Sequence, residues 1–310
     1  MAIIRTMTGT RNGSPPRWPD FIHVGPPRTG TTWLHEVLIG HCGLPSFKET
    51  HYFDADYNRG ADWYLGLFQN PDQSLPMGEF GPTYFSNPLA RERIKKHSPD
   101  CKILCTFRDP AERLYSHYRL VRRKRRPVYD TFEKHWRSIL YSGSDVANYA
   151  TQLKHWQRTF GDSNVIVLFY DDLVADPQRY LNQVCDFVKI PRVPLDQSPV
   201  GDSEVFSAPA AAKSNSLSRR SVMAVDWIGK HGGAKLVQLG KNTRLRRKIR
   251  NLFMSDFEAL DPASADELRA LMLSETEELE RITGRDLTNW KPEAKRSDKL
   301  PEARIRLSAG

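Results

Sequence analysis

The sequence predicts an α/β fold of three layers, in which helices flank both faces of a central parallel β-sheet. Short apolar runs typical of buried strands alternate along the chain with segments of helical periodicity, an order that favours parallel strands joined by helices. With 310 residues, of which 39% are hydrophobic, the chain is long enough to bury a substantial core. We find no internal repeat. These observations predict one α/β domain.

The predicted elements follow one another with one long irregular stretch among them. A strand over 20–24 leads into an amphipathic helix over 31–40, and the irregular region covers 43–88. Pro110 begins a helix after the next strand, since proline suits the first helical position. A continuous apolar run over 164–170 indicates a further buried parallel strand. The elements expected after the irregular region are helix 89–97, strand 102–107, helices 110–125, 130–140 and 145–160, strand 164–170 and helix 177–188.

The two ends of the chain differ in composition from its middle. Residues 1–17 and 291–310 are polar and rich in proline or charge, so we expect both segments to be poorly ordered. The single domain is therefore predicted to cover 18–290.

The turn between the first strand and the first helix has the glycine spacing of a nucleotide P-loop. Gly25 and Gly30 are separated by four residues, but Thr31 stands where a P-loop has its lysine. Glycines let the backbone approach an oxyanion closely, and the N–H groups of a first helical turn favour negative charge. Arg28 is the only cation within the loop. The pattern indicates a P-loop-like anion site, although a plain Pro/Gly turn remains an alternative.

A second strand-turn-helix unit carries another arginine at a corresponding place. Arg108 ends the strand over 102–107, and Ser116 lies about two turns into the following helix. Ligands of open parallel sheets bind beyond the carboxyl ends of the strands, so Arg108 and the Arg28 loop should converge if their strands are neighbours. The alternative is a local ion pair of Arg108 with Asp109 or Glu112.

These two segments resemble sulfotransferases that use 3′-phosphoadenosine 5′-phosphosulfate (PAPS). The loop resembles the family's 5′-phosphosulfate-binding loop, and the second unit resembles its 3′-phosphate signature. The resemblance implies that Arg108 and Ser116 bind the 3′-phosphate and that Arg28, where most of the family has lysine, acts on the sulfuryl end. The implied contacts of the loop are Pro27, Arg28, Thr29, Gly30, Thr31, Thr32 and Trp33.

A third segment, Lys48-Glu49-Thr50-His51-Tyr52-Phe53-Asp54, resembles the glycosaminoglycan branch, notably the heparan sulfate 3-O- and N-sulfotransferases. The match implies that Glu49 is the catalytic base that deprotonates the acceptor hydroxyl, with His51 as its polar neighbour. An exposed loop carboxylate is the alternative for Glu49. The chain departs from this branch at Phe80, where these enzymes have lysine. Either the acceptor site has lost one charge or another residue supplies it.

Other segments contribute weaker candidates. By the resemblance, Tyr170 and Trp33 can contact adenine, although both can also be core aromatics. Lys213, Asn215 and Arg219 match loosely a late loop that closes over the nucleotide, for which a flexible loop is the alternative. Read without the resemblance, the aspartates after the strand over 164–170 favour a magnesium site of a P-loop phosphotransferase.

Composition limits the remaining classes. The formal net charge of +9 suits an anionic ligand. The basic cluster 122–126 either extends the electropositive region beside the predicted donor site or is a solvated helix end, and the cluster 241–250 can contact acidic glycans, lipid headgroups or RNA. No RNA-binding aromatic motif is present, and the four cysteines lack metal-binding spacing, so we expect free thiols. No apolar stretch reaches the ~18 residues of a membrane span, and we expect a cytoplasmic protein.

The sequence thus predicts sulfuryl transfer from PAPS to a hydroxyl of a glycan, a glycolipid or a secondary metabolite, by in-line attack and without a required metal. The alternatives are a P-loop kinase or NTPase-like phosphotransferase and a catalytically inactive anion-binding protein. The acceptor and the oligomeric state stay open.

Overall fold

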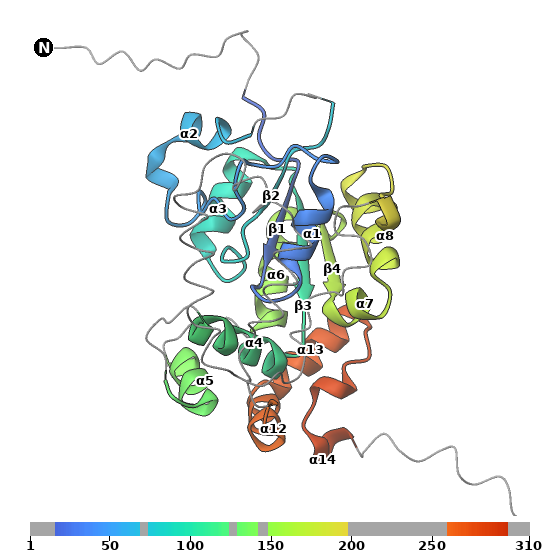
Figure 1. Cartoon of the computed structure of the whole chain (residues 1–310). Helices are drawn as coiled ribbons and strands as arrows, with labels where there is room; N and C mark the ends of the chain where they lie inside the picture. Colours follow the sequence, from blue (N-terminus) through green and yellow to red (C-terminus); the bar gives the residue numbers. More distant parts are fainter. Residues whose placement is uncertain (1–15, 69–73, 124–128, 142–147, 198–258, 297–310) are drawn as a thin grey trace, which may run out of the picture.

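The sheet has four parallel strands in the order β2-β1-β3-β4. The structure is a computed structural model that describes residues 16–68, 74–123, 129–141, 148–197 and 259–296. The strands are β1 (Phe21–Gly25), β2 (Gly78–Phe80), β3 (Lys102–Phe107) and β4 (Val165–Phe169). All four strands run in the same direction, so their carboxyl ends lie at one edge of the sheet, toward α4 in Figure 1.

Helices connect and cover these strands. The α-helices are α1 (Thr31–Leu38), α2 (Ala61–Leu65), α3 (Pro88–His97), α4 (Pro110–Arg123), α5 (Phe132–Tyr141), α6 (Tyr149–Phe160), α7 (Tyr170–Ala175), α8 (Pro177–Val188), α12 (Pro262–Leu271), α13 (Leu273–Thr283) and α14 (Glu293–Arg296). Short 3₁₀ turns are η1 (Tyr57–Arg59), η2 (Asp162–Asn164), η3 (Leu195–Gln197) and η4 (Thr288–Trp290).

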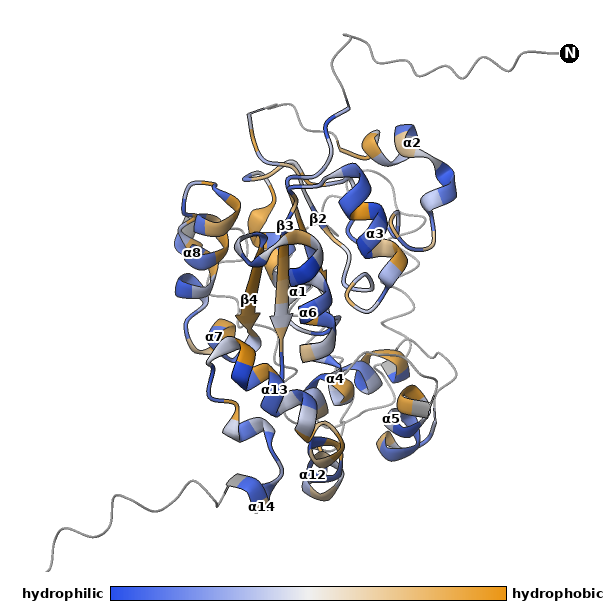
Figure 2. Ribbon diagram, turned by 180° about the vertical axis from the view of Figure 1, so that it is seen from behind, coloured by the Kyte–Doolittle hydropathy of each residue, from blue (hydrophilic) through white to orange (hydrophobic). Residues whose placement is uncertain are grey.

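The helices form layers on both faces of the sheet because side chains alternate along the strands. Phe21, Leu104 and Leu168 face α1, α7 and α8, whereas Ile22 and Ile103 face α3, α6 and α13. Both faces are covered, and β3 and β4 are accordingly coloured hydrophobic in Figure 2. The predicted three-layer α/β fold with a parallel sheet is confirmed.

A smaller cluster lies at the carboxyl edge of the sheet. Leu114 of α4 packs there with Trp136 of α5 and Leu268 of α12. Asp109, at the start of α4, accepts a hydrogen bond from the Arg269 guanidinium of α12 at 2.9 Å. The helix that carries Ser116 is therefore held from two sides.

The prediction of an irregular region over 43–88 was wrong in part. This stretch contains η1, α2 and the strand β2. β2 was missed because it has only three residues and a glutamate, Glu79, at its centre, so it shows neither an apolar run nor a clear alternation. The predicted elements also stopped before α12–α14, and Glu293–Arg296 extends the described fold past the predicted domain boundary at 290.

Two findings bear on other predictions. All four cysteines are buried free thiols, as expected. In the described ranges, no helix is both long enough and apolar enough to cross a membrane.

A buried hydrogen-bond chain fixes the end of β1. The His23 ring accepts from the Gly25 N–H at Nδ1 (3.2 Å), so its proton is on Nε2, which donates to Thr106 Oγ1 (2.9 Å). Thr106 contacts the Tyr180 hydroxyl at 2.7 Å and so links β1, β3 and α8. The β1–β3 register shifts between His23 and Gly25, and the strand bends there into the loop.

Burial and, to a lesser extent, the charge of Lys48 lower the pKa of His23 to about 3. The unfolded chain, with a pKa near the usual ~6.5, therefore binds a proton first as the pH falls. This histidine contributes stability that is present above pH ~6.5 and is lost as the pH falls toward its folded pKa, with a slope of about 1.4 kcal/mol per pH unit for one proton.

We predict that His23→Gln destabilises the protein at pH ~7 and that this difference shrinks as the pH falls, because the variant lacks the titrating ring. Urea unfolding of both proteins at pH ~7, ~6 and ~5 measures the effect. The raised pKa values of Glu79 and Asp109 are common to both proteins and cancel in the difference. Unfolding free energies that stay equally far apart at all three pH values would contradict the prediction.

Candidate functional site

The loop after β1 requires glycine at both of its ends. Gly25 has φ +104°, and a Cβ there would lie 2.5 Å from the carbonyl oxygen of Pro82. Gly30 has φ +89°, and a Cβ there would lie 2.5 Å from Leu173 Cδ2. Between them, Thr29 is buried and donates from Oγ1 to the Pro26 carbonyl at 2.7 Å. The loop is thus tightly packed from behind, and its shape depends on residues without side chains.

The first turn of α1 follows this loop without a side-chain cap. Gly30 is its N-cap, whereas Asn87, Asp176 and Asp261 cap α3, α8 and α12 with side-chain oxygens. The backbone N–H groups of a first turn have no partner within their own helix. They and the helix dipole favour an anion at this position.

The side chains of this turn differ in their exposure to solvent. Thr31 is buried and Thr32 is exposed. The Trp33 ring is 2% exposed and packs edge-on against Tyr180 at 6.2 Å between ring centroids. Trp33 is therefore a core aromatic, as the alternative for this residue predicted. Pro27 is partly buried within the loop.

The two arginine segments converge as predicted. β1 and β3 are neighbours, and Arg28 Nε donates to Ser116 Oγ of α4 at 3.1 Å, across 88 residues of sequence. Arg28 itself has φ +74°, a conformation that few residues other than glycine adopt. The strained loop residue thus points its side chain at the second segment.

Arg108 lies beside the same helix. Its Nη2 donates to Glu112 at 3.2 Å, as the local ion-pair alternative predicted, and its guanidinium lies over the Tyr170 ring at 4.4 Å from the centroid. Glu112 and Ser116 are one helical turn apart on α4, so they share a face. The structure therefore brings Arg28, Ser116 and Arg108 together at the carboxyl edge of the sheet.

Tyr170, the first residue of α7, lies next to Arg108. Its ring is 5% exposed and lies between Arg108 and Gly30, where a Cβ would approach Tyr170 Cδ2 to 3.5 Å. Its contact with adenine stays a prediction. Lys213, Asn215 and Arg219 lie outside the described residues, as do most of the basic cluster 122–126 and all of 241–250.

Lys48 is a residue that the sequence analysis did not assign. Its Nζ donates to Thr31 Oγ1 at 3.3 Å, to Thr32 Oγ1 at 3.4 Å and to Glu49 Oε1 at 2.5 Å. The loop therefore has a second cation, which comes from outside it. The signal was available, since Lys48 is adjacent to the predicted base, but nothing in the sequence relates it to α1.

The segment that carries Glu49 has an unusual backbone. Glu49 has φ +63° and His51 has φ +55°, both in the left-handed region. Such conformations cost about 1–3 kcal/mol each and persist only where the surroundings enforce them. The Glu49 side chain is 37% exposed, so the predicted base reaches solvent.

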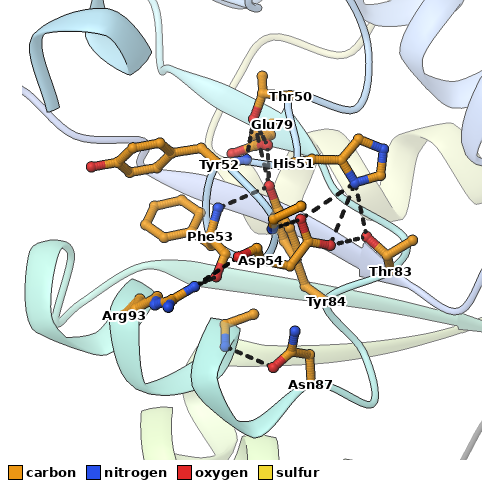
Figure 3. A network of polar contacts seen from close by, with 12 residues as sticks. Thr50, His51, Tyr52, Phe53, Asp54, Glu79, Thr83, Tyr84, Asn87 and Arg93 are labelled. Carbon is orange, nitrogen blue, oxygen red and sulfur yellow. Dashed lines mark hydrogen bonds and ion pairs between the residues drawn. The ribbon is translucent and has the colours of Figure 1, made fainter. Parts of the chain in front are cut away.

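Buried Glu79 of β2 is what holds this segment (Figure 3). Its carboxyl oxygens accept from Thr50 Oγ1 at 2.5 Å and from Tyr84 OH at 2.7 Å. They also accept from Tyr64 OH at 2.5 Å. Thr50 Oγ1 in turn accepts from the Tyr52 N–H at 3.1 Å. Burial raises the pKa of Glu79, and the three hydroxyl donors oppose that rise. Glu79 was also missed as a site residue, because the short strand that contains it was not predicted.

His51 faces a second polar group rather than the glutamate network. Its Nδ1 lies 3.4 Å from Asp54 Oδ2 and 3.5 Å from Thr83 Oγ1, and its side chain is 40% exposed. Thr83 donates to Asp54 at 2.5 Å, and Arg93 fixes the adjacent backbone through the Phe53 and Asp54 carbonyls (Figure 3). Asp54 therefore orients His51 toward the exposed side.

The aspartates after β4 have structural partners. Asp171 accepts from Trp290 Nε1 at 3.0 Å, and Asp172 pairs with Arg285 at 2.6 Å. Both contacts tie α7 to the C-terminal part of the described chain. Within the described ranges, no group of three or more His, Cys, Asp or Glu side chains is arranged to hold a metal ion.

We predict that Thr50→Val lowers the free energy of unfolding by about 1–3 kcal/mol, because the buried carboxyl of Glu79 loses a donor and the Tyr52 N–H loses its acceptor. Urea denaturation measures the loss. Thr159→Val is the matched control, since Thr159 donates only to the carbonyl of His155 within its own helix. Equal, small effects of both substitutions would show that the Glu79 network does not hold this segment.

Comparison with known proteins identifies the family. The profile of the family described as Sulfotransferase domain matches residues 18–201. Human heparan sulfate glucosamine 3-O-sulfotransferase 3B1 is 30% identical over 187 residues, which are 58% of this chain and 48% of that protein. Human bifunctional heparan sulfate N-deacetylase/N-sulfotransferase 1 is 27% identical over 198 residues, 56% of this chain and 22% of that protein.

The chain spans about half the length of the 3-O-sulfotransferase that it matches. Among solved structures, a sulfotransferase from Alicyclobacillus acidocaldarius has the same fold, with a TM-score of 0.60 and 21% identity over 88% of this chain and 99% of that one. The predicted resemblance to both heparan sulfate branches is confirmed. The family match contains Arg28, Glu49, Arg108, Ser116 and Tyr170, and the chain belongs to the sulfotransferase family.

Proposed function

We propose that the protein transfers a sulfuryl group from PAPS to an acceptor hydroxyl. The observation that carries the proposal is the Arg28–Ser116 hydrogen bond at 3.1 Å, which joins the two predicted anion-binding segments. One donor molecule with a phosphosulfate at one end and a 3′-phosphate near the other would engage both segments at once. Family membership supports this donor.

The residues fit the two ends of such a donor. The first turn of α1 offers backbone N–H groups and the nearby cations Arg28 and Lys48 to a phosphosulfate. Arg108, between β3 and α4, and Ser116, in the middle of α4, are proposed to bind the 3′-phosphate. Tyr170, packed against Arg108, is suited to an adenine ring.

Glu49 is proposed to remove the proton of the acceptor hydroxyl. In the overall reaction an O–S bond to the acceptor forms, the S–O bond to the 5′-phosphate breaks, and its electron pair leaves on the phosphate oxygen. The chain's own contribution is to hold the anion, to position the carboxylate and to stabilise the charge that develops on the leaving oxygen.

The acceptor is proposed to be a glycan hydroxyl, with glycolipid and small-molecule alcohols as further candidates. Relatives named as heparan sulfate sulfotransferases support a glycan. Phe80, where the resemblance led us to expect lysine, is buried, so this position itself offers no charge to an acceptor.

The phosphotransferase alternative is less well supported. It needs a lysine in the loop and an aspartate toward magnesium, but Thr31 holds the first position and Asp171 and Asp172 are engaged by Trp290 and Arg285.

We predict that the protein binds adenosine 3′,5′-bisphosphate more tightly than ATP–magnesium, and that Arg108→Met reduces this preference by about tenfold or more, because a charged contact to the 3′-phosphate is lost. Calorimetry with both nucleotides and with adenosine 5′-monophosphate measures the effect. The variant should bind the monophosphate like the wild type. A wild-type preference for ATP–magnesium would reject the sulfotransferase proposal.

We predict that Glu49→Gln lowers turnover about 100-fold to 10,000-fold while nucleotide affinity stays within about twofold. Labelled sulfate transfer from PAPS is measured on a panel of heparan sulfate oligosaccharides, a glycolipid and alcohols. Glu92→Gln, an exposed glutamate on α3, is the control. Turnover that survives in Glu49→Gln would remove this residue from the mechanism, and tight nucleotide binding without any transfer would favour an inactive binding protein.

A further inference from the structure

Lys48 lies at the junction of the donor loop and the predicted base. Its ammonium contacts hydroxyls of Thr31 and Thr32 at 3.3 and 3.4 Å and the carboxylate of Glu49 at 2.5 Å. The side chain is only 17% exposed, so the charge is largely removed from water. A lysine that loses hydration in this way needs anionic or polar partners, and it has them on both sides of the predicted reaction centre.

The place of this ammonium corresponds to that of the missing loop lysine. In a P-loop the lysine follows the second glycine and reaches the phosphates; here that position is Thr31. Lys48 comes from the segment after α1 and sets its Nζ on the hydroxyl of that same residue. An anion held by the first turn of α1 would therefore meet an ammonium, although the loop itself has none.

The charge of Lys48 also acts on the two histidine rings that pack against the buried Phe80. The Phe80 ring is 1% exposed and packs against His23 at 5.6 Å and His35 at 5.3 Å between centroids. After burial, the charge of Lys48 is the next cause that lowers the pKa of both histidines, to about 3 for His23 and about 4 for His35. Lys48 thus places a positive charge near Phe80, the position at which the resemblance led us to expect a lysine.

Arg28 approaches the loop from a different direction. Its Nε is directed at Ser116 on α4, on the side of the predicted 3′-phosphate contacts. Lys48 instead contacts Thr31, Thr32 and Glu49. The two cations therefore flank the loop from different sides.

We infer that Lys48 is a further catalytic residue, whose ammonium binds the sulfuryl group during transfer and holds Glu49 next to it. This inference rests on the proposed function. The ammonium keeps its proton throughout, and Glu49 takes the proton of the acceptor hydroxyl as the O–S bond forms. Lys48 thereby offsets the negative charge of the five-coordinate sulfur arrangement and places base and sulfuryl group within one ammonium's reach.

The test compares two ligands that differ only in the sulfuryl group. Calorimetry measures adenosine 3′,5′-bisphosphate and PAPS, without acceptor, on the wild type, Lys48→Met and Lys48→Arg. We expect Lys48→Met to weaken PAPS about tenfold or more and the bisphosphate no more than about twofold, and Lys48→Arg to recover part of the loss. With an acceptor that the wild type sulfates, single-turnover transfer should fall at least about 100-fold in Lys48→Met.

Lys102→Met is the matched control. Lys102 is partly buried, donates to Asn164 and lies at the amino end of β3, at the opposite edge of the sheet. It should leave both affinities unchanged.

Three outcomes would overturn the inference. The first is an equal loss of affinity for PAPS and for the bisphosphate in Lys48→Met, and the second is no loss of affinity for either ligand. The third is a Lys48→Met protein that no longer folds, together with a Lys48→Arg protein that binds PAPS no better than the bisphosphate. A wild type that binds neither ligand better than ATP–magnesium would instead reject the proposed function, so the two failures are distinguishable.

Discussion

The parallel pairing of β1 with β3 is the constraint on which the rest of the site depends. Two strand-turn-helix units far apart in the sequence end at one edge of the sheet because their strands are parallel neighbours, with Phe21 opposite Lys102. The buried chain from His23 through Thr106 to Tyr180 fixes that pairing at the point where β1 turns into the loop. Without this alignment, Arg28 and Ser116 would have no reason to meet.

The base segment is positioned by a different means. Its backbone is strained at Glu49 and His51, and no helix or strand contains it. Buried Glu79 compensates, since a carboxyl that accepts three hydroxyl donors in a dry environment defines the position of each donor closely. The pKa of Glu79 is raised by burial, and its stabilising partners are the same side chains that anchor Thr50. The backbone strain at Glu49 and His51 is thus offset by the buried hydrogen bonds of Glu79.

Much of this could be predicted from the sequence because local rules apply to it. The apolar runs of β3 and β4, the glycine spacing from Gly25 to Gly30, and Pro110 as a helix start all act over a few residues. Contacts set by three-dimensional position could not be predicted. Lys48 and Thr31 are 17 residues apart, with a helix and a turn between them, and the hydroxyl partners of Glu79 come from three separate segments. β2 was missed because its central residue serves this network rather than the apolar core.

The presence of arginine at position 28 follows from the division between two cations. A guanidinium has N–H groups on three nitrogens in a rigid fork, so Arg28 can engage Ser116 through Nε while its other nitrogens serve further contacts. A lysine at position 28 would have a single nitrogen for both the Ser116 hydrogen bond and the further contacts. Arginine also keeps its charge at all ordinary pH values, which suits a purely electrostatic part at the donor. The compact ammonium that the loop lacks is instead brought by Lys48, beside the predicted base, where a small point charge can contact Thr31, Thr32 and Glu49 together. Arg28 and Phe80, the two positions at which the resemblance led us to expect lysine, then belong to one proposed arrangement: a guanidinium directed at α4 and an ammonium beside the predicted base.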